Sequence, residues 1–370
     1  MEILNLNVNP DKYKNVLGDK TYWFELVGHA HEVYTLAKRI PPVVLDFIKD
    51  GPIHLLVSNE FECFLDVPET MLKVLVLENK IPEHKIVFLS GAKDIQKIIP
   101  KIASKVNQEL GTHLIGFQSE FFGWFEYCLS QNYSQSQKSF EIVMMKRSLA
   151  LLGKMNYKKH FLLLNRRWRP HRPTLVGLLY SRNLLKFGYT SLGNNDQNFN
   201  WDNIFDICLS LNNNSNIREM LLTNKEKIMQ LEDLVLDSDD FDYKIPTLNK
   251  SLDPYYVHSF MSVVTETYFY EDAPLFISEK TFRPIVYRQP FILVSLPYSL
   301  AFLRELGYKT FHPFIDESYD VETNNSLRMY KILTEIERIC TLNQQELQEL
   351  SLQVKDICYH NQKVLFSRSK

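Results

Sequence analysis

The stretch from Ser262 to Tyr319 constrains the fold most strongly, because short apolar runs alternate there with segments of helical character. An apolar run that begins at Ser262 leads into a polar loop, which ends in Ser278-Glu279-Lys280 before a short helix. A second apolar run, FILV, comes next and is followed by a helix that Gly307 closes. Strands that alternate with helices predict a mainly parallel sheet covered by helices. The stretch therefore indicates an α/β fold.

The same alternation continues through the rest of the chain. Apolar runs predict further strands, and apolar residues at helical spacing predict helices at 94–106 and 174–183. The chain of 370 residues is also longer than the roughly 250–300 residues at which single cores stop growing. We therefore expect a first domain at 1–150, a second at 151–340 and a terminal helix at 341–370. The further strands are expected at Ile53–Val57, Ile86–Leu89, Leu114–Phe117 and Phe161–Leu164.

The terminal segment has the pattern of an amphipathic helix. Asn343 can cap it, and Glu346 stands three residues later, as in a capping box. One face carries an apolar stripe that must pack against another part of the protein. The helix could pack through this stripe on its own domain, or it could cross back and pack on the first domain. Its members are Leu347, Leu350, Val354 and Ile357.

Composition indicates which kinds of binding partner and which cellular compartment to expect for this protein. The formal net charge is -2, so no overall positive field attracts the chain to nucleic acid or to membranes. Five scattered cysteines in apolar contexts predict buried free thiols. The first residues lack an apolar secretory segment, and no apolar run is long enough to span a membrane. A cytoplasmic location is expected.

The Ser278-Glu279-Lys280 corner is the first candidate site. Ser278 is a good helix N-cap, which would direct the backbone N–H groups of the first turn toward an anion. Lys280 adds a positive charge suited to a diphosphate, and the Glu279 carboxylate can accept hydrogen bonds from two ribose hydroxyls. The plain alternative is a capped helix start with a surface ion pair.

The second candidate is the basic run from Lys154 to Arg172, which holds seven Lys or Arg residues and no acid. An apolar strand within it delivers Asn165 to a loop at the strand's carboxyl end, where α/β folds bind ligands. Arg167 lies in that loop, and Arg172 lies beside a helix start where its fork can contact phosphate oxygens. The alternatives are an ordinary basic surface or a track for nucleic-acid phosphates.

Together these motifs resemble the donor-binding half of GT-B glycosyltransferases, with the α1,3-fucosyltransferase and exostosin-like group as the nearest likeness. The resemblance covers roughly Lys158–Arg338 and departs from the family pattern at Thr267 and within Gly188–Asn194. It implies two Rossmann-like domains with a cleft between them, and a nucleotide-diphosphate sugar as the donor.

The resemblance also assigns residues to the donor. Asn165 and Arg172 fall at the family's strand, turn and arginine, and Glu266 falls in the motif Val264-Thr265-Glu266-Thr267. In the family's second motif the glutamate contacts the donor ribose and the lysine contacts the diphosphate. Those roles are implied for Glu279 and Lys280.

An inverting enzyme of this type needs a general base near the acceptor hydroxyl. The architecture implies that the base follows a strand of the first domain, where Glu60 and Glu62 are the best candidates and Asp66 and Glu120 the reserves. No metal or cofactor is expected, because Lys, Arg and helix N-termini can neutralise the leaving diphosphate.

Three functions follow as alternatives. The first is a glycosyltransferase acting on a glycan or a lipopolysaccharide-type acceptor. The second is a phage-type DNA glycosyltransferase that modifies a hydroxymethylated base. The third is a non-catalytic binding protein of the same fold.

Overall fold

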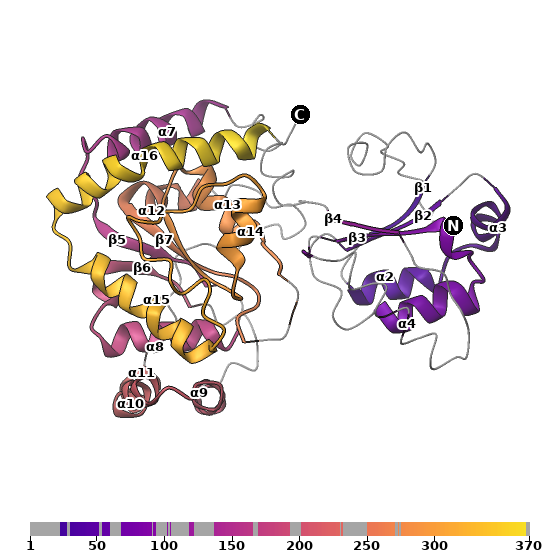
Figure 1. Cartoon of the computed structure of the whole chain (residues 1–370), viewed down its shortest axis with the longest axis horizontal. Coiled ribbons are helices and arrows are strands. Elements are labelled where there is room, and N and C mark those ends of the chain that lie inside the picture. Colours follow the sequence, from indigo (N-terminus) through magenta and orange to yellow (C-terminus); the bar gives the residue numbers. More distant parts are fainter. Residues whose placement is uncertain are drawn as a thin grey trace. The chain divides into compact units, whose positions relative to one another are not determined.

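The computed structural model describes residues 23–27, 30–51, 54–59, 68–90, 92–93, 102, 104, 118–121, 137–165, 169–192, 201–229, 231, 250–270, 273 and 275–367. It is mixed α/β with two parallel sheets (Figure 1). Residue contacts divide the chain into two compact units. The first unit comprises Met1–Trp124 and Asp272–Phe276, and the second comprises Phe125–Glu271 and Ile277–Lys370.

The sheet of the first unit has the order β1-β2-β3-β4, with all described pairs parallel. Its strands are β1 (Trp23–Val27), β2 (His54–Asn59), β3 (Ile86–Ser90) and β4 (Gln118–Phe121). Buried side chains of β2 and β3 form one core with the helices α2 (Ala30–Ala37), α3 (Pro42–Asp50) and α4 (Pro68–Lys73). A π-helical segment, Val74–Glu78, continues α4.

A short piece of chain from the second half of the sequence completes the first unit. Phe276 forms an antiparallel bridge with Ala92, and the carbonyl oxygen of Leu275 accepts a hydrogen bond from Lys93 N at 2.7 Å. The chain therefore leaves the second unit after β7 (Ser259–Thr265) and returns to it before α13 (Glu279–Val286).

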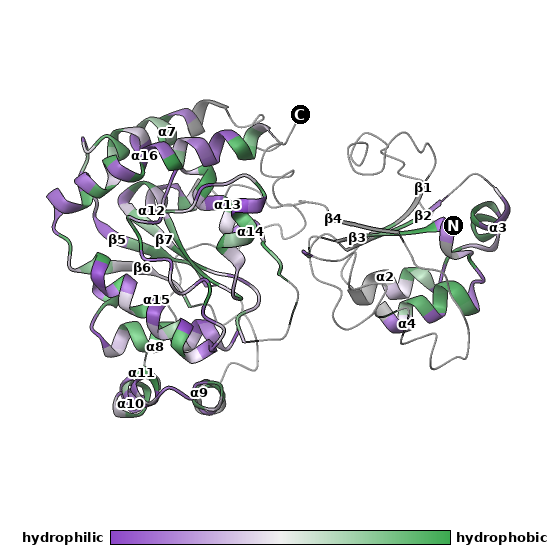
Figure 2. Ribbon diagram, viewed as in Figure 1, coloured by the Kyte–Doolittle hydropathy of each residue, from purple (hydrophilic) through white to green (hydrophobic). Residues whose placement is uncertain are grey.

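The sheet of the second unit has the order β6-β5-β7-β8, again with all described pairs parallel. It contains β5 (Lys159–Leu163), β6 (Gly188–Thr190), β7 and β8 (Phe291–Val294). Every residue of β7 and β8 is buried, as expected for parallel strands covered on both faces. Figure 2 shows hydrophobic residues along β7, in the interior of this unit.

Helices cover both faces of this second sheet (Figure 1). One group comprises α7 (Gln137–Leu151), α12 (Asp253–His258), α13 and α16 (Gln344–Ser367), which contact one another. The other group includes α8 (His171–Ser181) and α15 (Asn325–Cys340), with α9 (Trp201–Ser210) and α10 (Ser215–Thr223) beside α8. The short helices α11 (Lys225–Met229) and α14 (Ser299–Glu305) complete the set.

The direction of the connections reverses between β5 and β7. From β5 the chain runs to β6 on one side, and β7 then returns to the other side of β5. In open parallel sheets ligands bind at such a reversal, outside the carboxyl ends of the strands. Among the described strands, the carboxyl ends of β5 and β7 therefore mark the place to examine for a site.

Helix α7 belongs to the second unit, so the observed division lies earlier than the expected boundary at 150. The physical reason is Arg147, which is fully buried and donates hydrogen bonds to four backbone carbonyl oxygens of that unit. The acceptors belong to Tyr256, Ser259, Tyr287 and Arg288, at distances of 3.0–3.1 Å.

The terminal helix forms as its sequence predicts. Asn343 Oδ1 accepts hydrogen bonds from the N–H groups of Gln345 and Glu346, and the Glu346 carboxylate accepts one from Asn343 N at 2.7 Å. The capping box is thereby confirmed, and α16 packs against α7 and α13 inside the second unit.

The expectations about the cysteines, the strand at 114–117 and membrane spans can be compared with the described residues only in part. Cys208, Cys340 and Cys358 are buried free thiols, and burial raises the pKa of Cys358 to about 12. Cys63, Cys128 and the strand expected at 114–117 lie outside the described residues. Within the described ranges, no helix combines the length and the apolar character needed to cross a membrane.

Candidate functional site

At the carboxyl edge of the second sheet, hydrogen bonds connect residues at the ends of β5, β6 and β7. Leu162 pairs with Ser262, so the parallel register brings Asn165 opposite Thr265. Thr265 Oγ1 donates a hydrogen bond to Asn165 Oδ1 at 2.6 Å, and Asn165 N donates to Ser191 Oγ at 2.9 Å. Asn165 thus links β5 to the residues that end β7 and follow β6. Its amide nitrogen Nδ2 is buried and has no hydrogen-bond partner.

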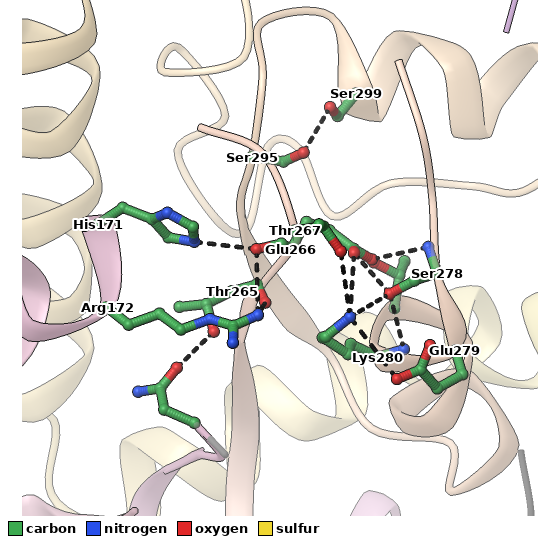
Figure 3. Close-up of polar contacts among 12 residues, drawn as sticks. His171, Arg172, Thr265, Glu266, Thr267, Ser278, Glu279, Lys280, Ser295 and Ser299 are labelled. Carbon is green, nitrogen blue, oxygen red and sulfur yellow. Dashed lines mark hydrogen bonds and ion pairs between the residues drawn. The ribbon is translucent and has the colours of Figure 1, made fainter. Parts of the chain in front are cut away.

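Glu266 follows β7 and holds the first turn of α13 (Figure 3). Its fully buried carboxylate accepts hydrogen bonds from Ser278 N at 3.1 Å, Ser278 Oγ at 2.6 Å and Thr281 Oγ1 at 2.6 Å. A buried carboxylate needs such donors, because its charge loses the solvation of water. These bonds place Glu266 beneath the corner as a positioning residue, and the predicted contact with the donor stays a prediction.

Ser278 is the N-cap of α13, as the sequence predicts, and its hydroxyl oxygen accepts a hydrogen bond from Lys280 N at 3.4 Å. The hydroxyl is nearly inaccessible, with 1% of the residue exposed. Because Ser278 N already donates to Glu266, this N–H group is not directed at an external anion. Within the first turn, the N–H group of Thr281 donates to the carbonyl oxygen of Ser278 at 3.2 Å.

Lys280 and Glu279 are the partly exposed members of the corner, with 27% and 22% of their side chains accessible. Lys280 Nζ donates to Ser278 Oγ at 2.8 Å and lies 3.6 Å from a Glu279 carboxylate oxygen and 3.9 Å from one of Glu266. Burial alone would raise the pKa of Glu279, but the charges of Lys280 and Arg283 together with hydrogen bonds to the carboxylate lower that pKa overall. Figure 3 shows Lys280 beside Ser278 and Thr267, with Glu279 next to Lys280.

Arg172, at the start of α8, points to the end of β7. Its guanidinium donates hydrogen bonds to the carbonyl oxygens of Thr265 at 3.2 Å and Glu266 at 3.3 Å, and only 4% of the residue is exposed. The sequence analysis predicted a fork-like contact between Arg172 and phosphate. In the structure the guanidinium fastens α8 to the backbone of β7, and the contact with phosphate stays a prediction.

His171 lies beside Arg172 and is fully buried. Its Nε2 lies 2.9 Å from the carbonyl oxygen of Glu266, and its ring stacks on Phe269 with 5.6 Å between the centroids. Burial lowers its pKa well below the ordinary value, and the nearby charges of Arg172, Arg169 and Lys280 lower it further. The imidazole is therefore neutral. Because a carbonyl only accepts, Nε2 carries the proton, and the buried Nδ1 keeps a lone pair with no hydrogen-bond partner.

Arg169 is a residue that the sequence analysis did not single out. It is half-buried just before α8, and its charge acts on the His171 imidazole together with those of Arg172 and Lys280. Positive charge therefore converges where the connections reverse between β5 and β7. The signal was present in the basic run, but the sequence did not distinguish Arg169 from its neighbours.

The described residues of the basic run, 154–165 and 169–172, fall into groups at different places in the structure. Lys158 precedes β5, whereas Asn165 and Arg169 follow it, and a five-residue strand of about 16 Å separates the two groups. Arg172 is buried against the end of β7. The run therefore contributes to both ends of the sheet.

Arg328, on α15, is a second residue that sequence reasoning missed. Only 1% of it is exposed, and its guanidinium donates to the carbonyl oxygens of Ser295, Phe269 and Glu322. These contacts fasten the loops that follow β7 and β8, so Arg328 acts as a positioning residue. Its place in an amphipathic helix gives no sequence signal of that role.

The remaining predicted residues cannot be placed with the others. Glu60, Glu62, Asp66 and Arg167 lie outside the described residues. Glu120 lies in β4, but its side chain is outside the description. The site as described thus brings together Asn165, Arg172, Glu266, Ser278, Glu279 and Lys280 from the predicted set.

Comparison of the chain with family models, with curated proteins and with solved structures gave no match in any of the three.

Proposed function

We propose that this chain is a glycosyltransferase that moves a sugar from a nucleotide-diphosphate sugar to a glycan or a lipopolysaccharide-type acceptor. In this proposal the two units are Rossmann-like domains of GT-B architecture with a cleft between them. One observation carries it: Lys280 and Glu279 stand partly exposed on a buried hydrogen-bonded base at the reversal point of a parallel sheet.

The charges of the site suit a leaving nucleoside diphosphate. The Lys280 ammonium and the Arg169 guanidinium supply positive charge where the β-phosphate would acquire negative charge as the glycosidic bond breaks. Glu279, whose pKa is lowered, stays ionised near neutral pH and can accept hydrogen bonds from ribose hydroxyls. No metal ligand is required by this scheme.

The buried residues keep this pair in place. Glu266 fixes the start of α13 through Ser278 and Thr281, and Arg172 fixes the end of β7 to α8. A site held by buried bonds loses less conformational entropy on binding than a flexible one. We therefore assign the binding contacts to Lys280, Glu279 and Arg169, and the positioning contacts to Glu266 and Arg172.

The acceptor hydroxyl would be deprotonated by a carboxylate of the first unit if the enzyme inverts configuration. Glu60 and Glu62 follow β2 directly in the chain and remain the candidates for that base. Replacing each with glutamine should then lower turnover without lowering nucleotide affinity.

Thermal unfolding with GDP, UDP, CMP, TDP and ADP tests the donor class. A ligand that binds only the folded state raises the unfolding midpoint by mass action, so one diphosphate should raise it more than the others. Lys280→Ala should abolish sugar transfer from the matching donor, whereas the control Lys363→Ala, on an exposed position of α16, should not. Failure of every nucleotide to shift the wild-type midpoint would contradict the proposal.

The type of acceptor needs a separate measurement. A DNA acceptor would bind with an affinity that falls steeply with salt concentration, whereas a neutral glycan would not. The separation of the basic run onto two ends of the sheet gives no support to a phosphate track, so we favour the glycan. Nucleotide binding without transfer to any acceptor would favour a non-catalytic binding protein.

A further inference from the structure

Helix α7 carries a stripe of exposed apolar side chains on its outer face, which we call the α7 stripe. Its members are Ile142 (55% exposed), Met145 (57%), Leu149 (38%) and Leu152 (39%), the last directly after the helix. The opposite face of α7 is the one packed inside the second unit, where Val143, Met144, Arg147, Ala150 and Leu151 are buried. The helix is therefore apolar on two faces, and the interior accounts for only one of them.

The spacing of the stripe is that of a helix seam. Positions 142, 145, 149 and 152 follow intervals of three, four and three residues, which are the a and d positions of a heptad repeat. Such a seam packs against another helix with its side chains interlocked. Leu352 of α16, 47% exposed, widens the apolar surface near Gly153, because its Cδ1 lies 3.8 Å from the position of a Cβ there.

We propose that the α7 stripe is the interface between two copies of this chain, packed as a parallel helix pair about a two-fold axis. A two-fold interface brings the same surface of each copy together, so an apolar seam is complementary to itself. The net charge of -2 adds little repulsion between copies. This inference does not depend on the proposed function.

The charges beside the stripe favour the parallel arrangement. Glu141 and Lys146 are exposed and occupy g and e positions, five residues apart. In a parallel pair, Glu141 of one copy faces Lys146 of the second copy, as opposite charges do across two-stranded coiled coils. An antiparallel pair centred on the stripe would instead place Lys146 against Lys146.

Sedimentation of the full chain over a wide range of concentrations tests the interface. The wild type should associate to a dimer, and Met145→Glu should weaken the dimer by more than about tenfold, because it buries a charge at the centre of the seam. Met145→Leu should leave the dimer unchanged. The matched control is Val321→Glu, at an apolar residue that is 60% exposed elsewhere, and it should also have no effect.

A cysteine at position 145 tests the direction of packing. In a parallel pair, position 145 of one copy meets position 145 of the other, so Met145→Cys should form a disulfide-linked dimer under mild oxidation, and the wild type should not. A monomeric wild type at every concentration would overturn the proposal, as would a dimer that Met145→Glu leaves intact. Dimerisation without the cysteine cross-link would overturn the parallel arrangement. Because Met145 is 57% exposed in the single chain, the Met145→Glu monomer should stay folded, and a single cooperative unfolding transition should show this.

Discussion

The starts of α13 and α14 invite comparison, because each follows one of two adjacent strands and each meets a carboxylate from elsewhere in the chain. At α13 the carboxylate is Glu266, and at α14 it is Asp320, which accepts hydrogen bonds from Leu300 N at 2.8 Å and Ala301 N at 3.1 Å. Asp320 neutralises the partial positive charge of its helix start directly. At α14, the protein therefore supplies its own anion.

The start of α13 differs from that of α14 in the side chains that surround the carboxylate. Glu266 bonds to Ser278 and Thr281, while Lys280 and Glu279 extend from the same turn with part of their surface accessible. The cation near α14, Arg304, instead pairs with the protein's own acids, Glu317 at 3.5 Å and Asp320 at 3.8 Å. The two starts show that a helix N-terminus at the carboxyl edge becomes a candidate site through its side chains.

The largest effect expected from this comparison concerns the two carboxylates. Glu266→Ala should lower the free energy of unfolding by about 3 kcal/mol, because three buried donors lose their acceptor. Asp320→Ala removes a helix cap and should cost about 1 kcal/mol. Urea denaturation of both variants measures the two losses in free energy of unfolding. Equal losses would show that Glu266 and Asp320 stabilise the fold to the same extent, against this prediction.

The second expected effect distinguishes the two cations. Lys280→Ala should weaken binding of the nucleotide diphosphate by about tenfold or more, since it removes a charge-assisted contact. Arg304→Ala should leave nucleotide affinity unchanged, because this arginine pairs with Glu317 and Asp320. Calorimetric titration of both variants makes the comparison. A similar loss for Arg304→Ala would place the ligand at α14 instead.

The smallest effect concerns pH. The pKa of Glu279 is lowered in the folded state by Lys280 and Arg283 despite burial, so its contribution to stability is lost as pH falls through that folded pKa. The pKa of Asp320 is raised, chiefly by burial, so the folded state takes up its proton first and gains stability as pH falls toward the unfolded value.

Substitution of each acid should therefore change acid unfolding in opposite directions. Glu279→Gln should make the loss of stability below about pH 5 shallower, and Asp320→Asn should make it steeper. Denaturation midpoints measured at a series of pH values give both slopes. If both variants shift the slope the same way, the contrast between the two helix starts is wrong.

Local features of this fold could be predicted from sequence, because they depend on neighbouring residues. The buried runs of β7 and β8, the Ser278 cap and the Asn343–Glu346 capping box all formed where the sequence indicated. Each is decided within a few residues by hydrophobicity or by capping geometry. The capping pattern also led to Lys280 and Glu279, which are partly accessible at the edge of the sheet, and their roles toward a donor stay predictions.

Contacts between distant segments could not be predicted in the same way. Arg172 was expected to face a ligand, but the register of β5 with β7 places the carbonyl oxygens of Thr265 and Glu266 within its reach. The buried guanidiniums of Arg147 and Arg328 likewise bond to carbonyl oxygens far away in the chain. No periodicity or local motif specifies such partners, so the place of α7 in the second unit and the positioning residues required the three-dimensional structure.

The segment Asp272–Phe276 belongs to the first unit although it lies far along the chain from the rest of that unit. This arrangement limits how the two units can be exchanged between related chains by recombination. A single crossover near residue 124 would separate Ala92 and Lys93 from the segment that bridges to them. The recombined protein would then combine residues 1–124 of the first unit from one parent with the segment Asp272–Phe276 from the other. Because both contacts join backbone atoms, they depend on where the two segments lie and little on which residues occupy them, although more than 180 positions separate the segments in the chain.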